Sequence, residues 1–248
     1  MYDKLAAVYD RFMLEDVDYK AYASWINEIL SKRIGKRKNL LEVGCGTGNI
    51  TMEMHDLGYE VTGLDISEEM LVEADNKAFA AGADIQWIQG DISRLSLPAR
   101  FDAVISTMDT FNYLLEEKAL KEALHKVYES LRPGGTFIFD VNTPYRLETV
   151  YGNNSFHYLG DDVCYIWECH YDQVLDICSY DIAFFVQDTG DRYQRFDEYH
   201  EQRSYSQEHL SKWLEDAGFM DVEILDFATK ETPKSISEKI LLVAQKRG

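Results

Sequence analysis

Apolar residues recur along the chain with helical spacing in some segments and as short runs in others. Between Asp18 and Lys32 they return every three or four positions, which predicts an amphipathic helix. Short apolar runs at 39–43, 61–64, 85–88, 103–106 and 136–141 predict strands, and helical patterns at 49–57, 67–80 and 118–131 lie between them. This alternation predicts an α/β fold, a mostly parallel sheet with helices on both faces.

Local signals support two of these boundaries. Ser67 precedes Glu68 and Glu69, so a capping hydroxyl and early carboxylates mark a helix start. The segment 132–135, Arg-Pro-Gly-Gly, predicts a helix stop and a turn into the next strand.

The pattern changes between residues 142 and 205. This segment is rich in tyrosine and acidic residues, and apolar stretches at 163–167 and 182–186 are separated by turn-forming residues such as 188–191. We expect antiparallel hairpins here, and hence a β-rich subdomain (142–205) inserted into an α/β domain formed by 1–141 and 206–248. The α/β pattern resumes with a predicted helix at 207–217 and strands at 222–227 and 239–244.

A glycine-rich turn follows the first predicted strand. Gly44, Gly46 and Gly48 alternate with other residues, and Glu42 lies on the strand before them. Glycines at such a turn let a ligand approach the start of the next helix. The dinucleotide fingerprint G-x-G-x-x-G would need glycine at position 49, which is asparagine here.

Two further acids follow in order. Asp65 ends the second predicted strand, where a carboxylate can accept hydrogen bonds from a ribose, and Asp91 follows the third. Together with the E-x-G-x-G-x-G turn, they make the chain resemble the class I S-adenosylmethionine-dependent methyltransferases, in particular small bacterial members with an inserted β-rich subdomain. The resemblance is carried by motifs between about residues 40 and 131, and elsewhere by the order of the elements.

That resemblance implies a Rossmann-like sheet of seven strands whose last strand is antiparallel. It also implies that S-adenosyl-L-methionine lies across the carboxyl ends of the first strands. The opening segment, Tyr2-Asp3-x-x-Ala6-x-x-Tyr9-Asp10, is similar to one that folds over the cofactor in the family. The residues implied as cofactor contacts are Tyr9, Glu42, Gly44, Cys45, Gly46, Gly48, Asp65, Ile66, Met70, Asp91, Ile92 and Met108.

Several of these residues have a plainer interpretation. Ile66, Met70 and Ile92 could belong to the core, because apolar residues beside strands usually do. Asp65 could cap the helix that begins near Ser67. Glu42 could simply accept hydrogen bonds from amides of the turn.

The methyl acceptor is less well marked. Polar residues cluster at the carboxyl ends of the fourth and fifth predicted strands, the edge at which ligands bind in open α/β sheets. The candidate pocket residues, among which no catalytic group is identified, are Asp109, Asn112, Tyr113, Asn142, Tyr145 and, from the insertion, His170. Asp109 and Asn112 could instead make loop hydrogen bonds. No Asn/Asp-Pro-Pro-aromatic turn follows the fourth strand, so methylation of base amines is disfavoured.

The composition of the chain narrows the classes of molecule that it could bind. With 25 basic and 44 acidic residues the formal charge is −19, which disfavours nucleic acid as a partner. No apolar stretch is long enough to span a membrane, and the four cysteines lack metal-binding spacing, so we expect a cytoplasmic protein without a bound metal. The aromatic residues of the insertion could form its own core or a homodimer surface.

The sequence therefore predicts an S-adenosylmethionine-dependent methyltransferase that acts on a small molecule. Alternatives are a cofactor-binding regulatory or scaffold protein without turnover, an RNA or protein methyltransferase, and an NAD-linked oxidoreductase. The last is disfavoured by Asn49.

Overall fold

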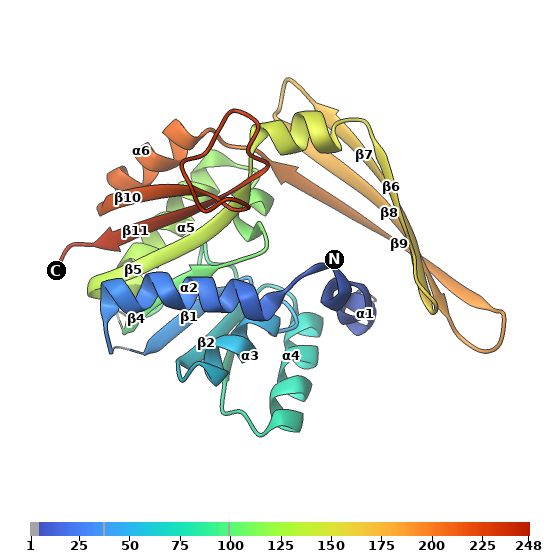
Figure 1. The fold of residues 1–248 in the computed structure, drawn as a ribbon, viewed down its shortest axis with the longest axis horizontal. Helices are drawn as coiled ribbons and strands as arrows, with labels where there is room; N and C mark the ends of the chain where they lie inside the picture. The colour runs from blue at the N-terminus through green and yellow to red at the C-terminus, as the bar shows by residue number, and fades with distance from the viewer. Residues whose placement is uncertain (1–4, 37, 99) are drawn as a thin grey trace.

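The computed structural model describes residues 5–36, 38–98 and 100–248, and these form two separate sheets with helices around the larger one (Figure 1). The larger sheet contains β1 (Asn39–Val43), β2 (Glu60–Asp65), β3 (Gln86–Gln89), β4 (Phe101–Ser106), β5 (Leu131–Asn142), β10 (Phe219–Asp226) and β11 (Lys239–Lys246). Their order is β10-β11-β5-β4-β1-β2-β3. Strand β11 runs opposite to the other six strands, so the predicted seven-stranded, mostly parallel sheet with an antiparallel last strand is confirmed.

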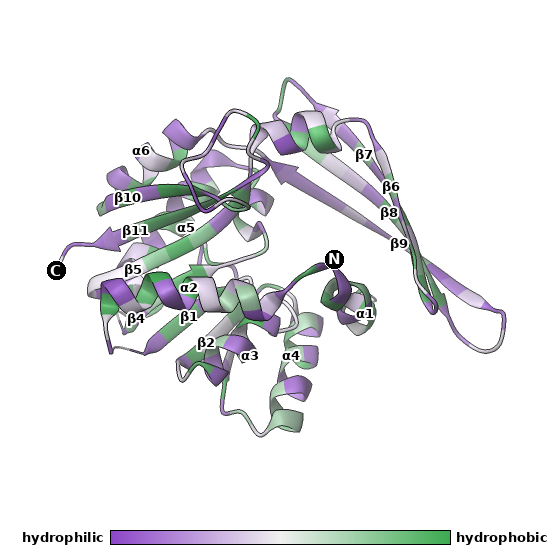
Figure 2. Cartoon of the chain, in the orientation of Figure 1, coloured by the Kyte–Doolittle hydropathy of each residue, from purple (hydrophilic) through white to green (hydrophobic). Residues whose placement is uncertain are grey.

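Helices cover both faces of this sheet, as predicted. They are α2 (Tyr19–Ile34), α3 (Asn49–Asp56), α4 (Glu68–Ala81), α5 (Glu117–Ser130) and α6 (Gln207–Ala217). Helix α1 (Ala6–Asp16) and the π-helix η2 (Arg146–Tyr151) pack on the second sheet, and the 3₁₀-helix η1 (Thr110–Tyr113) follows β4. Leu124 of α5 and Leu214 of α6 belong to one core cluster, whereas Ile26 of α2 and Met54 of α3 belong to the other. Figure 2 shows the apolar strands between these layers. No helix in the described part of the chain is long and apolar enough to cross a membrane.

The segment 132–135 is not the separate turn that the sequence predicts. Helix α5 ends at Ser130 and β5 begins at Leu131, so Arg-Pro-Gly-Gly forms the first part of the strand. The pairing with β4 shifts register there, between Phe101 and Ala103, and Gly134 has a φ of +75°. A glycine with positive φ lets the strand absorb this irregularity without ending.

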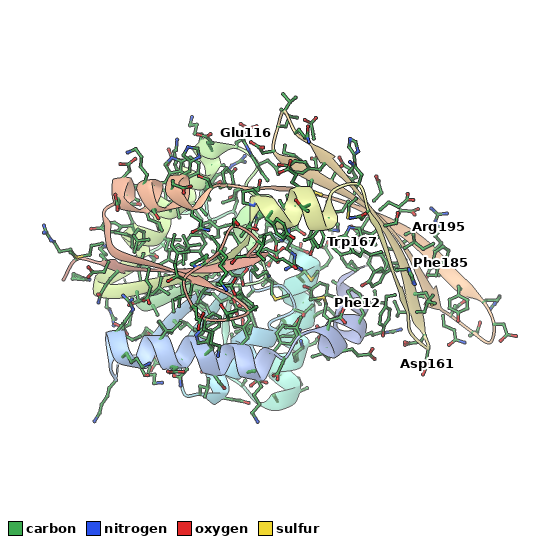
Figure 3. All side chains as sticks on the ribbon, turned by 45° about the horizontal axis from the view of Figure 1, so that its top comes forward. Phe12, Glu116, Asp161, Trp167, Phe185 and Arg195 are labelled. Carbon is green, nitrogen blue, oxygen red and sulfur yellow. The ribbon has the colours of Figure 1, made fainter. Side chains whose placement is uncertain are left out.

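The second sheet is built from β6 (Ser155–Leu159), β7 (Val163–Asp172), β8 (Ile177–Gln187) and β9 (Tyr193–Arg203). All three pairings are antiparallel, as expected for consecutive hairpins. Side chains alternate between two faces along each strand. We call the inner face the one that carries Phe184, which packs on α1, and Tyr180, which packs near η2. In Figure 3, Phe12 and Trp167 lie on this side, whereas Phe185 and Arg195 lie on the other.

A single buried side chain ties together the two points at which the chain enters and leaves the second sheet. Asn112 of η1 accepts a hydrogen bond from the Asn142 amide (2.8 Å) and donates to the carbonyl oxygens of Asn142 (3.1 Å) and Arg203 (2.9 Å). Asn142 ends β5 and Arg203 ends β9. Asn112 is fully buried, so water cannot replace these bonds at low cost.

We expect Asn112→Ala to lower the free energy of unfolding by roughly 2 to 5 kcal/mol, because it leaves three buried backbone groups without this partner. Asn76→Ala, on the exposed side of α4, is the matched control and should change stability by no more than about 0.5 kcal/mol. Urea unfolding followed by circular dichroism measures both. Equal stabilities of the two variants would show that Asn112 does not hold the junction.

Candidate functional site

The three turn glycines adopt left-handed backbone angles for different reasons. Gly44, Gly46 and Gly48 have φ values of +71°, +53° and +79°. A Cβ on Gly44 would overlap Thr110, and one on Gly48 would lie 3.0 Å from Trp87. A Cβ on Gly46 would meet nothing within 4 Å. Gly44 and Gly48 are thus needed for packing, whereas Gly46 borders open space in which a ligand can lie.

Asp65 connects this turn to the next helix. Its carboxylate accepts hydrogen bonds from the amides of Gly46 (2.8 Å) and Ser67 (2.9 Å). Burial raises the pKa of Asp65, although these amide hydrogen bonds oppose the rise. Asp65 is not the helix cap, because Ser67 itself accepts from the Met70 amide. Each oxygen retains acceptor capacity for a further donor, such as a ribose hydroxyl.

Glu42 lies fully buried beneath the turn. It accepts hydrogen bonds from the hydroxyl groups of Thr51 and Thr107, the second at 3.0 Å. The carboxylate of Glu42 is therefore held by side-chain hydroxyls. Burial raises the pKa of Glu42 to about 7.

Helix α1 closes the turn from the amino-terminal side. Asp10 accepts hydrogen bonds from Thr47 (2.7 Å) and Asn49 (2.9 Å) and pairs with Lys77 of α4 at 2.6 Å. Burial would raise the pKa of Asp10, but the hydrogen bonds from these three residues outweigh burial and lower it. A cavity lies at this junction, lined by Tyr9, Tyr19, Glu42, Gly44, Cys45, Gly46, Thr47, Asn49, Ile50, Thr107 and Met108. Tyr2 and Asp3 of the predicted segment lie outside the described residues.

The remaining predicted cofactor contacts differ in how far they are buried. Ile66 is 65% exposed beside Asp65, so it is not part of the core. Met70 is buried, and Ile92 belongs to the same core cluster as α5. Asp91 accepts from the amide (2.9 Å) and hydroxyl (2.7 Å) of Ser93 and is only partly buried.

The loop after β4 carries a strained turn. Met108 and Asp109 both have left-handed angles, with φ of +59° and +54°. Such angles cost about 1–2 kcal/mol for each non-glycine residue. The buried carboxylate of Asp140 on β5 compensates, because it accepts from the amides of Met108 (3.0 Å) and Asp109 (2.6 Å) and from the Tyr22 hydroxyl.

This turn places Asp109 between the two sheets. Its carboxylate accepts from Lys239 of β11 (2.8 Å) and from Gln202 of β9. Burial would raise the pKa of Asp109, but the Lys239 cation and these hydrogen bonds lower it. Burial would lower the pKa of Lys239, but the carboxylates of Asp109 and Asp140 raise it. Gln202 also accepts from Tyr180 (3.0 Å).

Sequence reasoning named Asp10 only as part of the opening segment, without a role, and missed Asp140, Lys239 and Gln202. One signal was available for Lys239: an antiparallel last strand begins at the edge where its parallel neighbours end, and Lys239 pairs with Asn142. No local pattern distinguishes Gln202 from other polar residues of β9.

The structure places the candidate acceptor residues in four different settings. Asp109 meets the second sheet, and the ring of Tyr113 lies 6.0 Å from that of His200 on the inner face. Asn112 and Asn142 are engaged in buried hydrogen bonds, Asn142 with Gln202 at 2.9 Å, as the loop-bonding alternative for Asn112 anticipates. Tyr145 is half-buried just before η2. His170 is exposed on the outer face of β7, so the structure does not bring it to this edge.

Known proteins share both the sequence and this architecture. Residues 40–135 match the model of a methyltransferase domain. A relative from Geobacillus sp. (strain WCH70) that carries a methyltransferase name is 34% identical over 247 residues, covering 99% of both chains. A crystal structure of an S-adenosylmethionine-dependent methyltransferase from Clostridium acetobutylicum matches with a TM-score of 0.90 and 35% identity, covering 100% of this chain and 99% of that one. The chain belongs to the S-adenosylmethionine-dependent methyltransferases.

A third relative matches the methyltransferase over part of its length. It is named as a dTDP-3-amino-3,4,6-trideoxy-alpha-D-glucopyranose N,N-dimethyltransferase of Streptomyces venezuelae and is 34% identical over 140 residues, which cover 54% of this chain and 56% of the relative. Together these findings exclude the oxidoreductase alternative and show that the chain is an enzyme that transfers methyl groups.

The residues at the glycine turn fit the cofactor S-adenosylmethionine. The space at Gly46 admits a ligand beside the backbone, and the Asp65 carboxylate lies at the end of β2 next to it. Exposed Ile66 offers an apolar surface at the same place. These three features match what a nucleoside with a ribose diol and a planar base requires.

We expect Gly46→Val to abolish binding of S-adenosylhomocysteine in calorimetric titration, because its side chain would fill the ligand space. It should leave the chain folded, at a cost of about 1–2 kcal/mol for the left-handed angle. Gly44→Val is the matched comparison: it overlaps Thr110 and should destabilise the fold itself. Undiminished affinity in Gly46→Val would show that the cofactor does not bind at this turn.

We expect Glu42 to make the free energy of unfolding fall as pH rises from about 4.5 to 7, because its folded-state pKa is raised and the folded protein binds the extra proton. Glu42→Gln should remove this fall, about 3 kcal/mol. Its amide can bond both threonine hydroxyls. Urea unfolding across this pH range measures the effect, with exposed Glu60→Gln as control. If Glu42→Gln kept the pH dependence of the wild type, protonation of Glu42 would not contribute to stability.

Proposed function

We propose that the methyltransferase transfers a methyl group to a small-molecule acceptor held between the turn at 108–109 and the inner face of the second sheet. The hydrogen bond from Gln202 of β9 to Asp109 carries this proposal. Asp109 directly follows Met108, which lines the cofactor cavity, and Gln202 lies on the inner face. The cavity proposed for the methyl donor and the inner face of the second sheet therefore meet at Asp109.

The described residues can exclude water and orient two reactants there. S-adenosylmethionine supplies an electrophilic methyl group on a sulfonium. Tyr9 and Met108 line the cavity, and burial raises the pKa of Tyr9 well above its usual value, so its phenol stays neutral. Alignment and removal of water can supply much of the acceleration of such a displacement.

The charge of the chain and one relative support a small acceptor. A formal charge of −19 repels nucleic acid. The Streptomyces venezuelae relative is named for methylation of a nucleotide-linked amino sugar, which is a small polar molecule. Within this proposal, residues 142–205 act as the acceptor-covering subdomain, and Asp109, Tyr113 and Tyr145 line the acceptor site.

A cytoplasmic location completes the proposal. All four cysteines, which lie in the described part of the chain, are free thiols, as is usual in a reducing compartment.

An acceptor screen tests the function. The protein is incubated with S-adenosylmethionine and small molecules that carry nucleophilic nitrogen, oxygen or sulfur, and S-adenosylhomocysteine is measured by mass spectrometry. We expect product formation that depends on a small molecule and is absent in Gly46→Val. Parallel reactions contain total RNA or peptides. Turnover with RNA or peptides alone would overturn the small-molecule proposal.

A further inference from the structure

The π-helix η2 places an arginine at the edge where the two sheets meet. Arg146, its first residue, donates its backbone amide to the hydroxyl of Thr143 (3.2 Å). That hydroxyl is bound to the carbonyl oxygens of Ser237 (2.6 Å) and Glu238 (3.1 Å), which directly precede β11. The start of η2 is therefore fixed beside the start of β11.

Tyr151, the last residue of η2, holds the side chain of Arg146 in place. Nε of Arg146 donates to the Tyr151 hydroxyl (2.9 Å), and the guanidinium carbon lies 4.9 Å from the centre of the Tyr151 ring. That ring lies 5.8 Å from the ring of Tyr180, whose hydroxyl donates to Gln202 (3.0 Å). Because Gln202 donates to Asp109, Arg146 belongs to the same set of contacts as the proposed acceptor site.

The two terminal nitrogens of Arg146 have no hydrogen-bond acceptor among the described residues, and no described carboxylate forms an ion pair with them. Both nitrogens reach solvent, since neither is a buried polar atom without a partner. Lys239, by contrast, already pairs with Asp109 at 2.8 Å and with Asp140 at 3.5 Å. A half-buried guanidinium without a carboxylate is unusual, because charges removed from water are normally paired.

The neighbouring charges leave Arg146 cationic and unpaired. Burial would lower the pKa of Arg146, but Tyr151 and the charges of Asp109 and Glu238 raise it. Asp109 is already in direct contact with Lys239, and Glu238 is exposed, so that solvent screens its charge. The guanidinium therefore offers a positive charge that no described neighbour neutralises by direct contact.

This arrangement suits an oxyanion. A carboxylate or a phosphate accepts two parallel hydrogen bonds from the terminal nitrogens of an arginine, and such pairs are stronger than hydrogen bonds between neutral groups. A cationic group would be repelled by Arg146, and the carboxylate of Asp109 is already engaged by Lys239 and Gln202. An uncharged group would leave the guanidinium unpaired.

We propose that Arg146 binds an anionic group of the acceptor, a carboxylate or a phosphate, so that the methyltransferase acts on a small organic anion. This deepens the proposed function and rests on it. The bound anion orients the acceptor at η2, and a nucleophilic atom elsewhere in the same molecule then lies toward Met108 and the cofactor. Arg146 determines specificity and takes no part in making or breaking bonds.

Binding of three matched probes tests the recognition step. Benzoate and phenyl phosphate carry the two anionic groups, and benzamide is an uncharged molecule with the shape of benzoate. Each is titrated by calorimetry into protein saturated with S-adenosylhomocysteine. We expect the wild type to bind one of the anions about tenfold more tightly than benzamide, as a charge-assisted pair would give, and the tighter anion identifies the class. Arg146→Gln should lose this preference while keeping its affinity for S-adenosylhomocysteine, which reports an intact fold.

Two further variants serve as controls. Arg195→Gln removes the same charge from the outer face of the second sheet, where Arg195 pairs with Asp197 (2.7 Å), and it should retain the wild-type preference (Figure 3). Arg146→Lys keeps the charge at η2 but cannot form two parallel hydrogen bonds, so its preference should lie between those of the wild type and Arg146→Gln.

Three results would overturn the proposal. They are equal binding of the three probes by the wild type, an unchanged preference in Arg146→Gln, and a loss of affinity for S-adenosylhomocysteine in a folded Arg146→Gln. The last would assign Arg146 to the carboxylate of the cofactor itself.

Turnover separates this inference from the proposed function. The acceptor screen is run with pairs of nucleophiles that differ only in whether they carry an anionic group, such as 4-hydroxybenzoate and 4-hydroxybenzamide. We expect a higher kcat/KM for the anionic members, and a loss of at least tenfold in Arg146→Gln. Methylation of uncharged molecules without such a preference would overturn the anion assignment and leave the small-molecule function standing. An intact preference in binding without turnover of any small molecule would count against the proposed function instead.

Discussion

The candidate site depends on the hydrogen bonds that the carboxylate of Asp140 accepts. Asp140 lies on the interior strand β5, is fully buried, and accepts hydrogen bonds from two consecutive backbone amides of the loop after β4. Without acceptors placed there, Met108 and Asp109 would have little reason to adopt left-handed angles. That geometry directs Met108 to the cavity beside the glycine turn and Asp109 to Lys239. One acid beneath the loop thus orders both sides of it.

The same acid explains why oppositely charged groups can be buried so close together. Lys239 lies 2.8 Å from Asp109 and 3.5 Å from Asp140. Burying any one of these charges alone would cost several kcal/mol. With amide, hydroxyl and ammonium donors shared among the carboxylates, the desolvation cost is offset by hydrogen bonds. The cluster therefore fixes the relative position of β4, β5 and β11 at the edge where the second sheet joins.

The sequence was sufficient for the parts of the fold that have a local physical cause. Apolar periodicity and the cap at Ser67 located helices α2 to α6 and the strands of the larger sheet, but not helix α1. The glycine turn was visible because its backbone angles need glycine. The prediction of a separate turn at 132–135 was wrong because proline and glycine also occur at an irregular strand start. Only the register with β4 distinguishes such a strand start from a turn.

The site was predicted where it depends on the turn and missed where it depends on contacts between distant segments. Asp10 acts on a loop 37 residues away in sequence, and Gln202 meets Asp109 across 93 residues. No spacing rule connects such positions. His170 and His200 both lie in the insertion, and the strand register places His170 on the outer face and His200 on the inner face.

The left-handed turn at 108–109 also limits how this protein can evolve. Glycine at either position would relieve backbone strain and suit the loop better on its own. At position 109, however, glycine would remove the carboxylate that holds Lys239 and Gln202. Selection for a less strained turn and selection for the contact that joins the two sheets thus act in opposite directions on one residue, a trade-off that is common where strain serves activity.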